Sequence, residues 1–113
     1  MKSYSGDNIK NVAILGHSGS GKTSLTEAIL FSVGATTRLG KTTDGNTVSD
    51  YDAEEIRRKV SIGSSIIPVE WQNDKFNFID TPGYFDFVGE VCSALRVADV
   101  ALIVVNAKSG IEV

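Results

Sequence analysis

The chain has 113 residues, the size of one small domain, and its hydrophobic (42%) and charged (22%) fractions are typical of a globular protein. This composition excludes a disordered tail, a collagen and a coiled coil. The net charge of −3 provides no broad basic surface, which argues against a protein that recognises specific DNA sequences. The longest apolar run, residues 100–105, is far shorter than the roughly 20 residues that cross a membrane, and no signal peptide follows Met1. We therefore expect a soluble, cytoplasmic protein without a membrane partner.

The N-terminal third predicts a strand, a glycine-rich turn and a helix in direct succession. Residues 1–9 form a polar lead that we expect to be flexible. Residues 11–16 are an apolar run ending in glycine, typical of a buried parallel strand. Residues 21–34 carry apolar side chains at helical spacing, and Gly34 stands where a helix C-terminal glycine belongs.

The remaining chain predicts a long polar loop, two paired strands, a helix and a strand. Residues 35–63 lack apolar periodicity, and a connection of this length is usually functional or disordered. Strands are predicted over 65–72 and 75–79, joined by a two-residue turn at Asn73 and Asp74. Pro68 cannot donate a hydrogen bond to a ladder, which places the first of these strands at the sheet edge.

The last two elements complete the predicted architecture. Val88, Cys92 and Leu95 recur at helical spacing and predict a helix that buries this face. Residues 100–105 predict a buried strand. The order of elements indicates an α/β fold with a mostly parallel sheet, one antiparallel edge strand and helices on both faces. Because an all-apolar strand expects neighbours on both sides, we expect the N-terminal part of a longer, here truncated, protein, and self-association of this piece alone.

The strongest motif is residues 16–23, Gly-His-Ser-Gly-Ser-Gly-Lys-Thr, which matches G-x-x-x-x-G-K-[ST]. Glycines allow the backbone to curl so that successive N–H groups point into one concavity, and the following helix N-terminus favours an anion there. Lys22 adds a mobile positive charge for the β- and γ-phosphates, and the Thr23 hydroxyl is a suitable Mg²⁺ ligand. The motif lies between a predicted strand and a predicted helix, as its function requires. We therefore predict a phosphate-binding loop.

The second motif is Asp80-Thr-Pro-Gly83 at the end of the strand over 75–79. Taken alone, Pro followed by Gly favours an ordinary turn. Downstream of a phosphate-binding loop, Asp80 can instead hold Mg²⁺ through water, and the bare N–H of Gly83 can approach a γ-phosphate. A loop held by that hydrogen bond relaxes when the γ-phosphate leaves, so the motif predicts a conformational switch.

Four blocks of the sequence together resemble the start of elongation factor G, a family of translational GTPases that act on the ribosome. These blocks are residues 11–30, 58–62, 78–87 and 109–112. The resemblance covers nearly all of residues 10–113. It implies a P-loop NTPase fold, and within it the N-terminal portion of a GTP-binding domain. Such a domain binds and hydrolyses GTP to GDP, uses Mg²⁺, and acts with the ribosome in translation elongation.

The resemblance also implies roles for individual residues. Lys22 and Tyr84 are the implied catalytic positions, with Tyr84 in the place that orients the attacking water, and residues 36–62 correspond to the first switch. The implied metal ligands are Thr23, Ser61 and Asp80. The implied nucleotide contacts are Gly16, His17, Ser18, Gly19, Ser20, Gly21, Lys22, Thr23, Ser24, Asp80, Thr81, Pro82, Gly83 and Tyr84.

Three positions depart from the family's pattern. Gly19 stands where the family has Asp, so a carboxylate role there is lost. In the block that usually reads R-G-I-T-I, Lys59 replaces Gly, whereas Ser61 retains a hydroxyl in place of Thr. Tyr84 replaces the histidine that follows D-T-P-G, which substitutes a neutral phenol for a ring that can carry positive charge. These departures favour an elongation factor G-like paralogue over the principal translocase and predict slow intrinsic hydrolysis.

Two other functions remain open from the residues alone. A P-loop ATPase or kinase is the first, because the guanine-reading N-K-x-D block would lie beyond Val113. A nucleotide-dependent binding module with little hydrolysis is the second, because Tyr84 occupies the water-orienting position.

Overall fold

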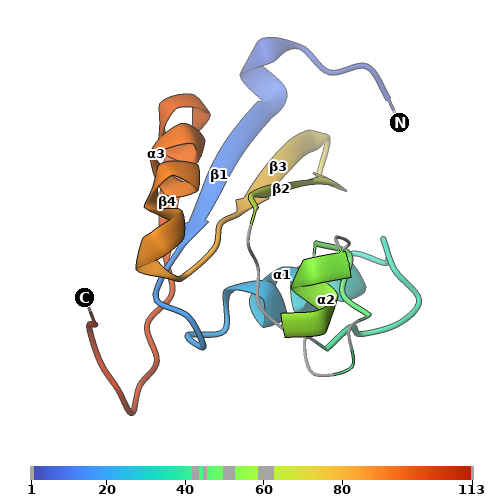
Figure 1. Cartoon of the computed structure of the whole chain (residues 1–113). Helices are drawn as coiled ribbons and strands as arrows, with labels where there is room; N and C mark the ends of the chain where they lie inside the picture. The colour runs from blue at the N-terminus through green and yellow to red at the C-terminus, as the bar shows by residue number, and fades with distance from the viewer. Residues whose placement is uncertain (1, 42–43, 45, 50–52, 59–62, 113) are drawn as a thin grey trace.

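The fold is an α/β sandwich seen in a computed structural model, which describes residues 2–41, 44, 46–49, 53–58 and 63–112 (Figure 1). Its elements are η1 (Gly6–Asn8), β1 (Ile9–Leu15), α1 (Lys22–Ser32), α2 (Ala53–Arg58), β2 (Ser65–Trp71), β3 (Asp74–Asp80), η3 (Phe85–Phe87), α3 (Val88–Val97) and β4 (Val100–Ile103). Every strand and helix predicted above is present. The strand expected over 100–105 is shorter than predicted and ends at Ile103.

The strands form one sheet in the order β2-β3-β1-β4. β1 pairs in parallel with both β3 and β4, whereas β2 pairs antiparallel with β3. This arrangement confirms the mostly parallel sheet with one antiparallel edge strand. Pro68 lies in β2 at the outer edge, where its missing N–H leaves no ladder hydrogen bond unmade.

The turn between β2 and β3 lies one residue earlier than predicted. Trp71 pairs with Asp74, so the two loop residues are Gln72 and Asn73, with φ of 47° and 68°. The predicted turn residue Asp74 belongs to β3 instead. Two consecutive residues with positive φ match the right-handed twist of a hairpin, and asparagine tolerates this conformation better than most residues. Moving the turn by one residue changes the pairing register by two residues, so the faces of β2 and β3 stay as predicted while the cross-strand partners change.

Two small cores form because side chains alternate across the sheet, which confirms helices on both faces. On one face, Leu30 of α1 packs with Ile67 and Val69 of β2. On the other face, Ala94 of α3 packs with Ala13 and Ile79, which are register partners in β1 and β3. The strands therefore hold one helix on each side, and the carboxyl ends of β1 and β3 meet at one edge of the sheet.

The face of α3 that the sequence predicts to be buried is largely exposed. Cys92 is exposed, and Val88 and Leu95 are 48% and 46% exposed, whereas Ala94 is buried. α3 packs on the sheet through its small residue Ala94, whereas its larger apolar side chains are left partly uncovered by the strands that the structure describes. All four residues of β4 are exposed as well.

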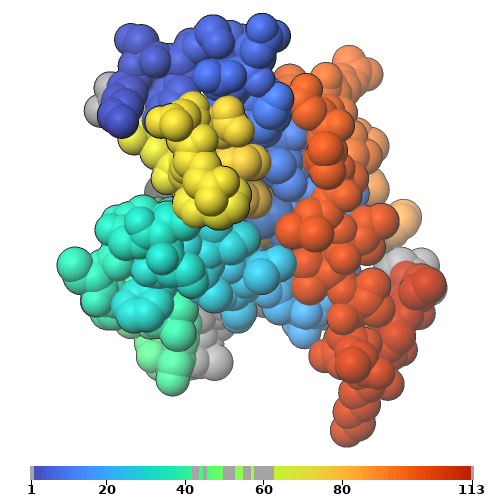
Figure 2. Space-filling view, turned by 180° about the vertical axis from the view of Figure 1, so that it is seen from behind, coloured from blue at the N-terminus to red at the C-terminus, as the bar shows by residue number. Residues whose placement is uncertain are grey.

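The loop that follows α1 lies against the rest of the molecule, whereas the C-terminal residues extend away from it. Figure 2 shows α1 and the residues after it as one continuous mass below the β2–β3 hairpin, with the C-terminal segment projecting from the opposite side. Among the helices that the structure describes, none has the length and hydropathy needed to cross a bilayer.

Candidate nucleotide-binding site

The loop between β1 and α1 curls tightly at the carboxyl end of β1. Its backbone adopts positive φ at Gly16, Gly19 and Gly21, and α1 begins directly afterwards at Lys22. The N–H of Ser20 donates to the carbonyl of His17 at 3.1 Å, which closes a turn within the loop. A strand, a curled glycine loop and a helix N-terminus therefore follow one another as the motif requires, and helix N-termini attract anions.

Lys22 points back into this loop. Lys22 is only 6% exposed. Its Nζ donates hydrogen bonds to the carbonyls of Gly16 at 2.7 Å and His17 at 3.0 Å. Burial lowers the pKa of Lys22 from its ordinary value, while the nearby charge of Asp80 acts in the opposite direction. The ammonium group is thus fixed inside the curve of the loop, beside the acidic end of β3.

Asp80 and Thr23 meet between the two motifs. Asp80 is the last residue of β3 and pairs in register with Ile14 of β1, so the parallel strands bring it beside the glycine loop. The residue is 1% exposed, and Thr23 Oγ1 donates to its Oδ2 at 2.7 Å. A hydroxyl and a carboxylate are hard oxygen donors of the kind that Mg²⁺ prefers, so the residues present fit this ion. The third predicted metal ligand, Ser61, lies outside the described residues, as does part of the predicted switch over 36–62.

The D-T-P-G segment is fastened to β1 and touches the glycine loop. Thr81 is 0% exposed, and its Oγ1 donates to the carbonyl of Ile14 at 2.6 Å. Two residues later, the carbonyl of Gly83 accepts a hydrogen bond from the N–H of Ser18 at 3.1 Å. A Cβ on Gly83 would overlap the backbone nitrogen of Ser18 and lie 2.6 Å from Lys22 Nζ, so the close approach requires glycine. The structure therefore brings both sequence motifs into direct contact.

His17 and Tyr84, the other two singled-out side chains, lie at the rim of this site. His17 Nδ1 is 3.0 Å from the carbonyl of Ser18 and 3.2 Å from Glu112 Oε2. Tyr84 follows Gly83 directly, is 44% exposed, and accepts a hydrogen bond at its carbonyl from the N–H of Phe87. Both side chains are accessible to a ligand or a partner.

Glu27 is a buried residue near the site that the sequence reasoning did not single out. It lies on α1 four residues after Thr23 and is 1% exposed. The sequence did carry one signal for it. Glu27 lies three positions before Leu30, so a charged residue shares a helix face with a residue that packs in the core, which is unusual for a carboxylate. Its contacts are described below, because they lie outside the proposed phosphate contacts.

A curled glycine loop after a parallel strand, a buried lysine and an acidic strand end beside a threonine hydroxyl define a P-loop nucleotide-binding domain. Residues 7–113 match the family described as the elongation factor Tu GTP binding domain. The chain belongs to this family of translational GTPases.

Similar proteins agree with this assignment. The chain is 44% identical over 104 residues to an "Elongation factor G-like protein" of Mycobacterium tuberculosis, which covers 92% of this chain and 15% of that protein. It is also 44% identical over 104 residues to a mitochondrial "Ribosome-releasing factor 2" of Danio rerio, covering 92% of this chain and 14% of that protein. A crystal structure of a protein from Thermus thermophilus superposes with a TM-score of 0.90 at 42% identity, over 96% of this chain and 16% of that one. The chain thus spans 12–15% of the length of these curated relatives.

Proposed function

We propose that this chain is the GTP-hydrolysing switch domain of an elongation factor G-like protein that acts on the ribosome in translation. The observation that carries the proposal is the contact between the two motifs: the N–H of Ser18 meets the carbonyl of Gly83, and Thr23 meets Asp80. A phosphate chain held by the first motif would therefore reach the second. Contact of this kind lets one nucleotide position both loops, which is the physical requirement for a switch.

The phosphates would be held by positive charge and backbone amides. Lys22 and the amides of residues 18–24 would contact them, and the helix N-terminus would add its partial positive charge. The full set of proposed nucleotide contacts is Gly16, His17, Ser18, Gly19, Ser20, Gly21, Lys22, Thr23, Ser24, Asp80, Thr81, Pro82, Gly83 and Tyr84. An incoming phosphate oxygen competes with the carbonyls that Lys22 and Ser18 now contact.

Thr23, Asp80 and Ser61 would serve Mg²⁺, with Asp80 acting through water. When bound, this ion supplies charge neutralisation at the phosphates. The contact of 2.7 Å between Thr23 Oγ1 and Asp80 Oδ2 supports the assignment, because it places two hard oxygen ligands together beside the phosphate-binding loop.

Hydrolysis would rest on positioning and electrostatics, without a covalent intermediate on the protein. The N–H of Gly83 would turn toward the γ-phosphate when the bond between the Gly83 carbonyl and Ser18 breaks. Lys22 would stabilise negative charge on the phosphates, and Tyr84 would orient the attacking water through its hydroxyl. A neutral phenol supplies less stabilisation than a positively charged ring, so the intrinsic rate would be low and the ribosome would raise it.

The test measures nucleotide preference and turnover of the full-length protein. Binding of fluorescent GTP, GDP and ATP analogues is titrated with and without Mg²⁺, and GTP hydrolysis is followed with and without ribosomes. We expect GTP and GDP to bind, ATP not to compete, and ribosomes to accelerate hydrolysis. A preference for ATP would refute the proposal and restore the ATPase or kinase alternative. Mg²⁺-independent binding would remove the metal assignment.

A second candidate function is a nucleotide-dependent binding module with little hydrolysis, and Tyr84 is the observation that favours it. Its side chain is accessible at the site rim, but it lacks the charge of the histidine that the family usually has there. Single-turnover hydrolysis of Tyr84→Phe and Tyr84→His in the presence of ribosomes separates the two functions. A catalytic hydroxyl predicts a loss of about 10²–10³ in rate for Tyr84→Phe, with unchanged nucleotide affinity and a rate at least equal to wild type for Tyr84→His. No ribosome-stimulated turnover in wild type, restored by Tyr84→His, would support the binding module.

A further inference from the structure

Glu27 holds a distant part of the chain through its buried carboxylate. Gly40, which lies 13 residues further along, donates its N–H to Oε2 at 3.3 Å. Val48, which lies 21 residues further along, donates its N–H to Oε1. Carboxylates are rarely buried without partners, and here each oxygen accepts a backbone amide from the same loop.

The loop is shaped to receive this carboxylate. A Cβ on Gly40 would lie 2.5 Å from Glu27 Oε2 and 2.9 Å from the carbonyl of Asn46, so a larger residue would displace the carboxylate or the loop from this contact. The side chain of Asn46 stabilises the same turn, because its Oδ1 accepts the N–H of Lys41 at 2.8 Å. Gly40, Lys41 and residues 46–49 are called the clamped segment below.

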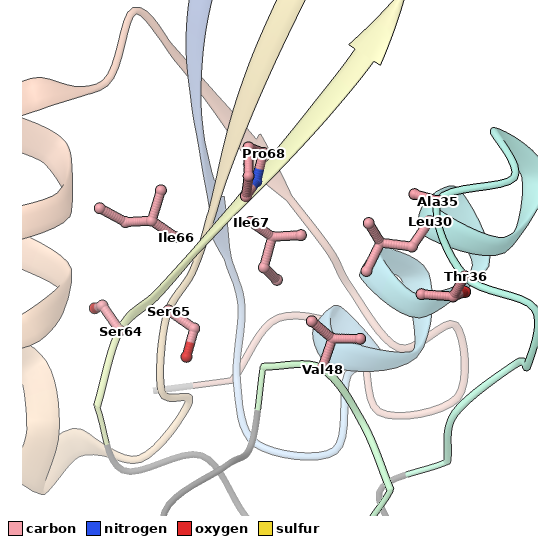
Figure 3. A pocket seen from close by; sticks show the side chains of 9 residues that line it. All are labelled: Leu30, Ala35, Thr36, Val48, Ser64, Ser65, Ile66, Ile67 and Pro68. Carbon is pink, nitrogen blue, oxygen red and sulfur yellow. The ribbon is translucent and has the colours of Figure 1, made fainter. Parts of the chain in front are cut away.

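The clamped segment is also fastened to the edge strand β2. Ser65 Oγ donates to the carbonyl of Ser49 at 2.6 Å, and both residues are buried. Figure 3 shows Val48 of the clamped segment across a pocket of about 540 Å³ from Ser65, with Leu30 of α1 on its wall. The segment therefore bridges α1, which begins with the proposed phosphate-binding residues, and the sheet.

We propose that Glu27 is a positioning residue that fixes the start of the polar loop on the phosphate-binding helix. This proposal rests on the function proposed above. Glu27 lies about one helical turn after Thr23, so the loop starts at a set place relative to the metal-binding hydroxyl. An amide side chain could not replace the carboxylate, because it has a single acceptor oxygen and would point its NH₂ group at a backbone N–H.

Limited proteolysis tests the clamp itself. Trypsin cleaves after lysine, and Lys41 lies in the clamped segment, so the cleavage rate there reports how often the segment leaves the helix. In the full-length protein, we expect Glu27→Gln to raise this rate about tenfold, the size of effect typical of one lost charge-assisted hydrogen bond. Asp7→Asn makes the same chemical change at an exposed carboxylate and should leave the rate unchanged. Equal cleavage at Lys41 in wild type and Glu27→Gln would overturn the proposal.

A second variant breaks the same contact from the loop side. Gly40→Ala should also raise cleavage about tenfold, because its Cβ meets the carboxylate. Gly6→Ala is the matched control, since nothing lies within 4 Å of a Cβ there. Both changes disturb the contact between Gly40 and Glu27, so the double variant Glu27→Gln/Gly40→Ala should be cleaved more slowly than the product of the two single effects predicts. Multiplicative effects would show independent sites and overturn the proposal.

Kinetics distinguish positioning from general support of the fold. In single-turnover experiments at saturating GTP, Glu27→Gln should lower hydrolysis about tenfold while GDP affinity changes by less than about twofold. Parallel losses in hydrolysis and GDP affinity would indicate a merely structural residue and overturn the proposal. A wild-type protein that hydrolyses no GTP would refute the proposed function instead, and the cleavage rates at Lys41 would still decide whether Glu27 holds the loop.

Discussion

Replacing Thr81 by valine is expected to loosen the junction between the two motifs. The Thr81 hydroxyl is fully buried and donates to the carbonyl of Ile14 at 2.6 Å, which fastens the D-T-P-G segment to the end of β1. Valine has nearly the same shape, so the change removes this donor without opening a cavity. A buried polar group that loses its partner costs about 1–3 kcal/mol. At about 1.4 kcal/mol per factor of ten, local opening of the junction becomes roughly 5 to 150 times more frequent.

Hydrogen exchange of the full-length protein measures this opening directly. Peptides that cover residues 12–16 and 78–83 should lose protection by that factor in Thr81→Val, whereas peptides from β2 should change less. Thr81→Ser retains the hydroxyl and is the matched control, so its protection should stay near that of wild type. Unchanged protection in Thr81→Val, or an equal loss in Thr81→Ser, would show that the hydrogen bond does not hold the junction.

Three further predictions test the metal site, the buried lysine and the exposed sheet edge. Thr23→Val should weaken GTP binding at least about tenfold in Mg²⁺ but leave binding in EDTA unchanged, as measured by fluorescence titration; an equal loss in both conditions would contradict the metal assignment. Because burial lowers the pKa of Lys22 and only the protonated amine attracts phosphate, nucleotide affinity should fall with rising pH beginning below the ordinary lysine pKa. Lys22→Arg should remove the part of this decline that comes from the lysine. The decline that remains comes from the guanine base, which titrates with both proteins. The 113-residue chain alone should self-associate through β4, where Ile103 is 68% exposed, and Ile103→Lys should shift its sedimentation toward the monomer; an unchanged distribution would exclude this edge.

Local patterns predicted the elements and the strand–loop–helix arrangement around the first motif well, because the signals for them lie within a few consecutive residues. The apolar run before Gly16 and the helical spacing after Gly21 each define an element without reference to the rest of the chain. Pro68 placed β2 at the sheet edge because the missing N–H is a property of the residue itself. The sequence assigned Thr23 and Asp80 to one Mg²⁺ site without predicting that they touch. The structure brings them into contact because the parallel strands β1 and β3 end at the same edge of the sheet.

Features that depend on distant residues were missed or misplaced. The prediction of the buried face of α3 was wrong because Ala94, rather than Leu95, packs against the sheet. The position of β1 determines which of these residues is buried. The predicted hairpin turn was one residue off because both positions leave the same side chains on each face, so the apolar pattern cannot choose between them. The clamp at Glu27 joins residues 13 and 21 positions apart, and no local pattern marks such partners.

Two groups of the candidate site that would face a phosphate already have hydrogen-bond partners within the protein, and this affects the affinity for phosphate. The Lys22 ammonium donates to two carbonyls of its loop, and the Ser18 amide donates to Gly83. A phosphate that binds here exchanges these hydrogen bonds for new ones, so the net affinity is a difference between two satisfied states. In the proposed function, a phosphate that engaged the Ser18 amide would release the Gly83 carbonyl and so couple the D-T-P-G segment to phosphate occupancy. Burial of Lys22 is tolerable because its ammonium group already donates to two backbone carbonyls before any ligand binds.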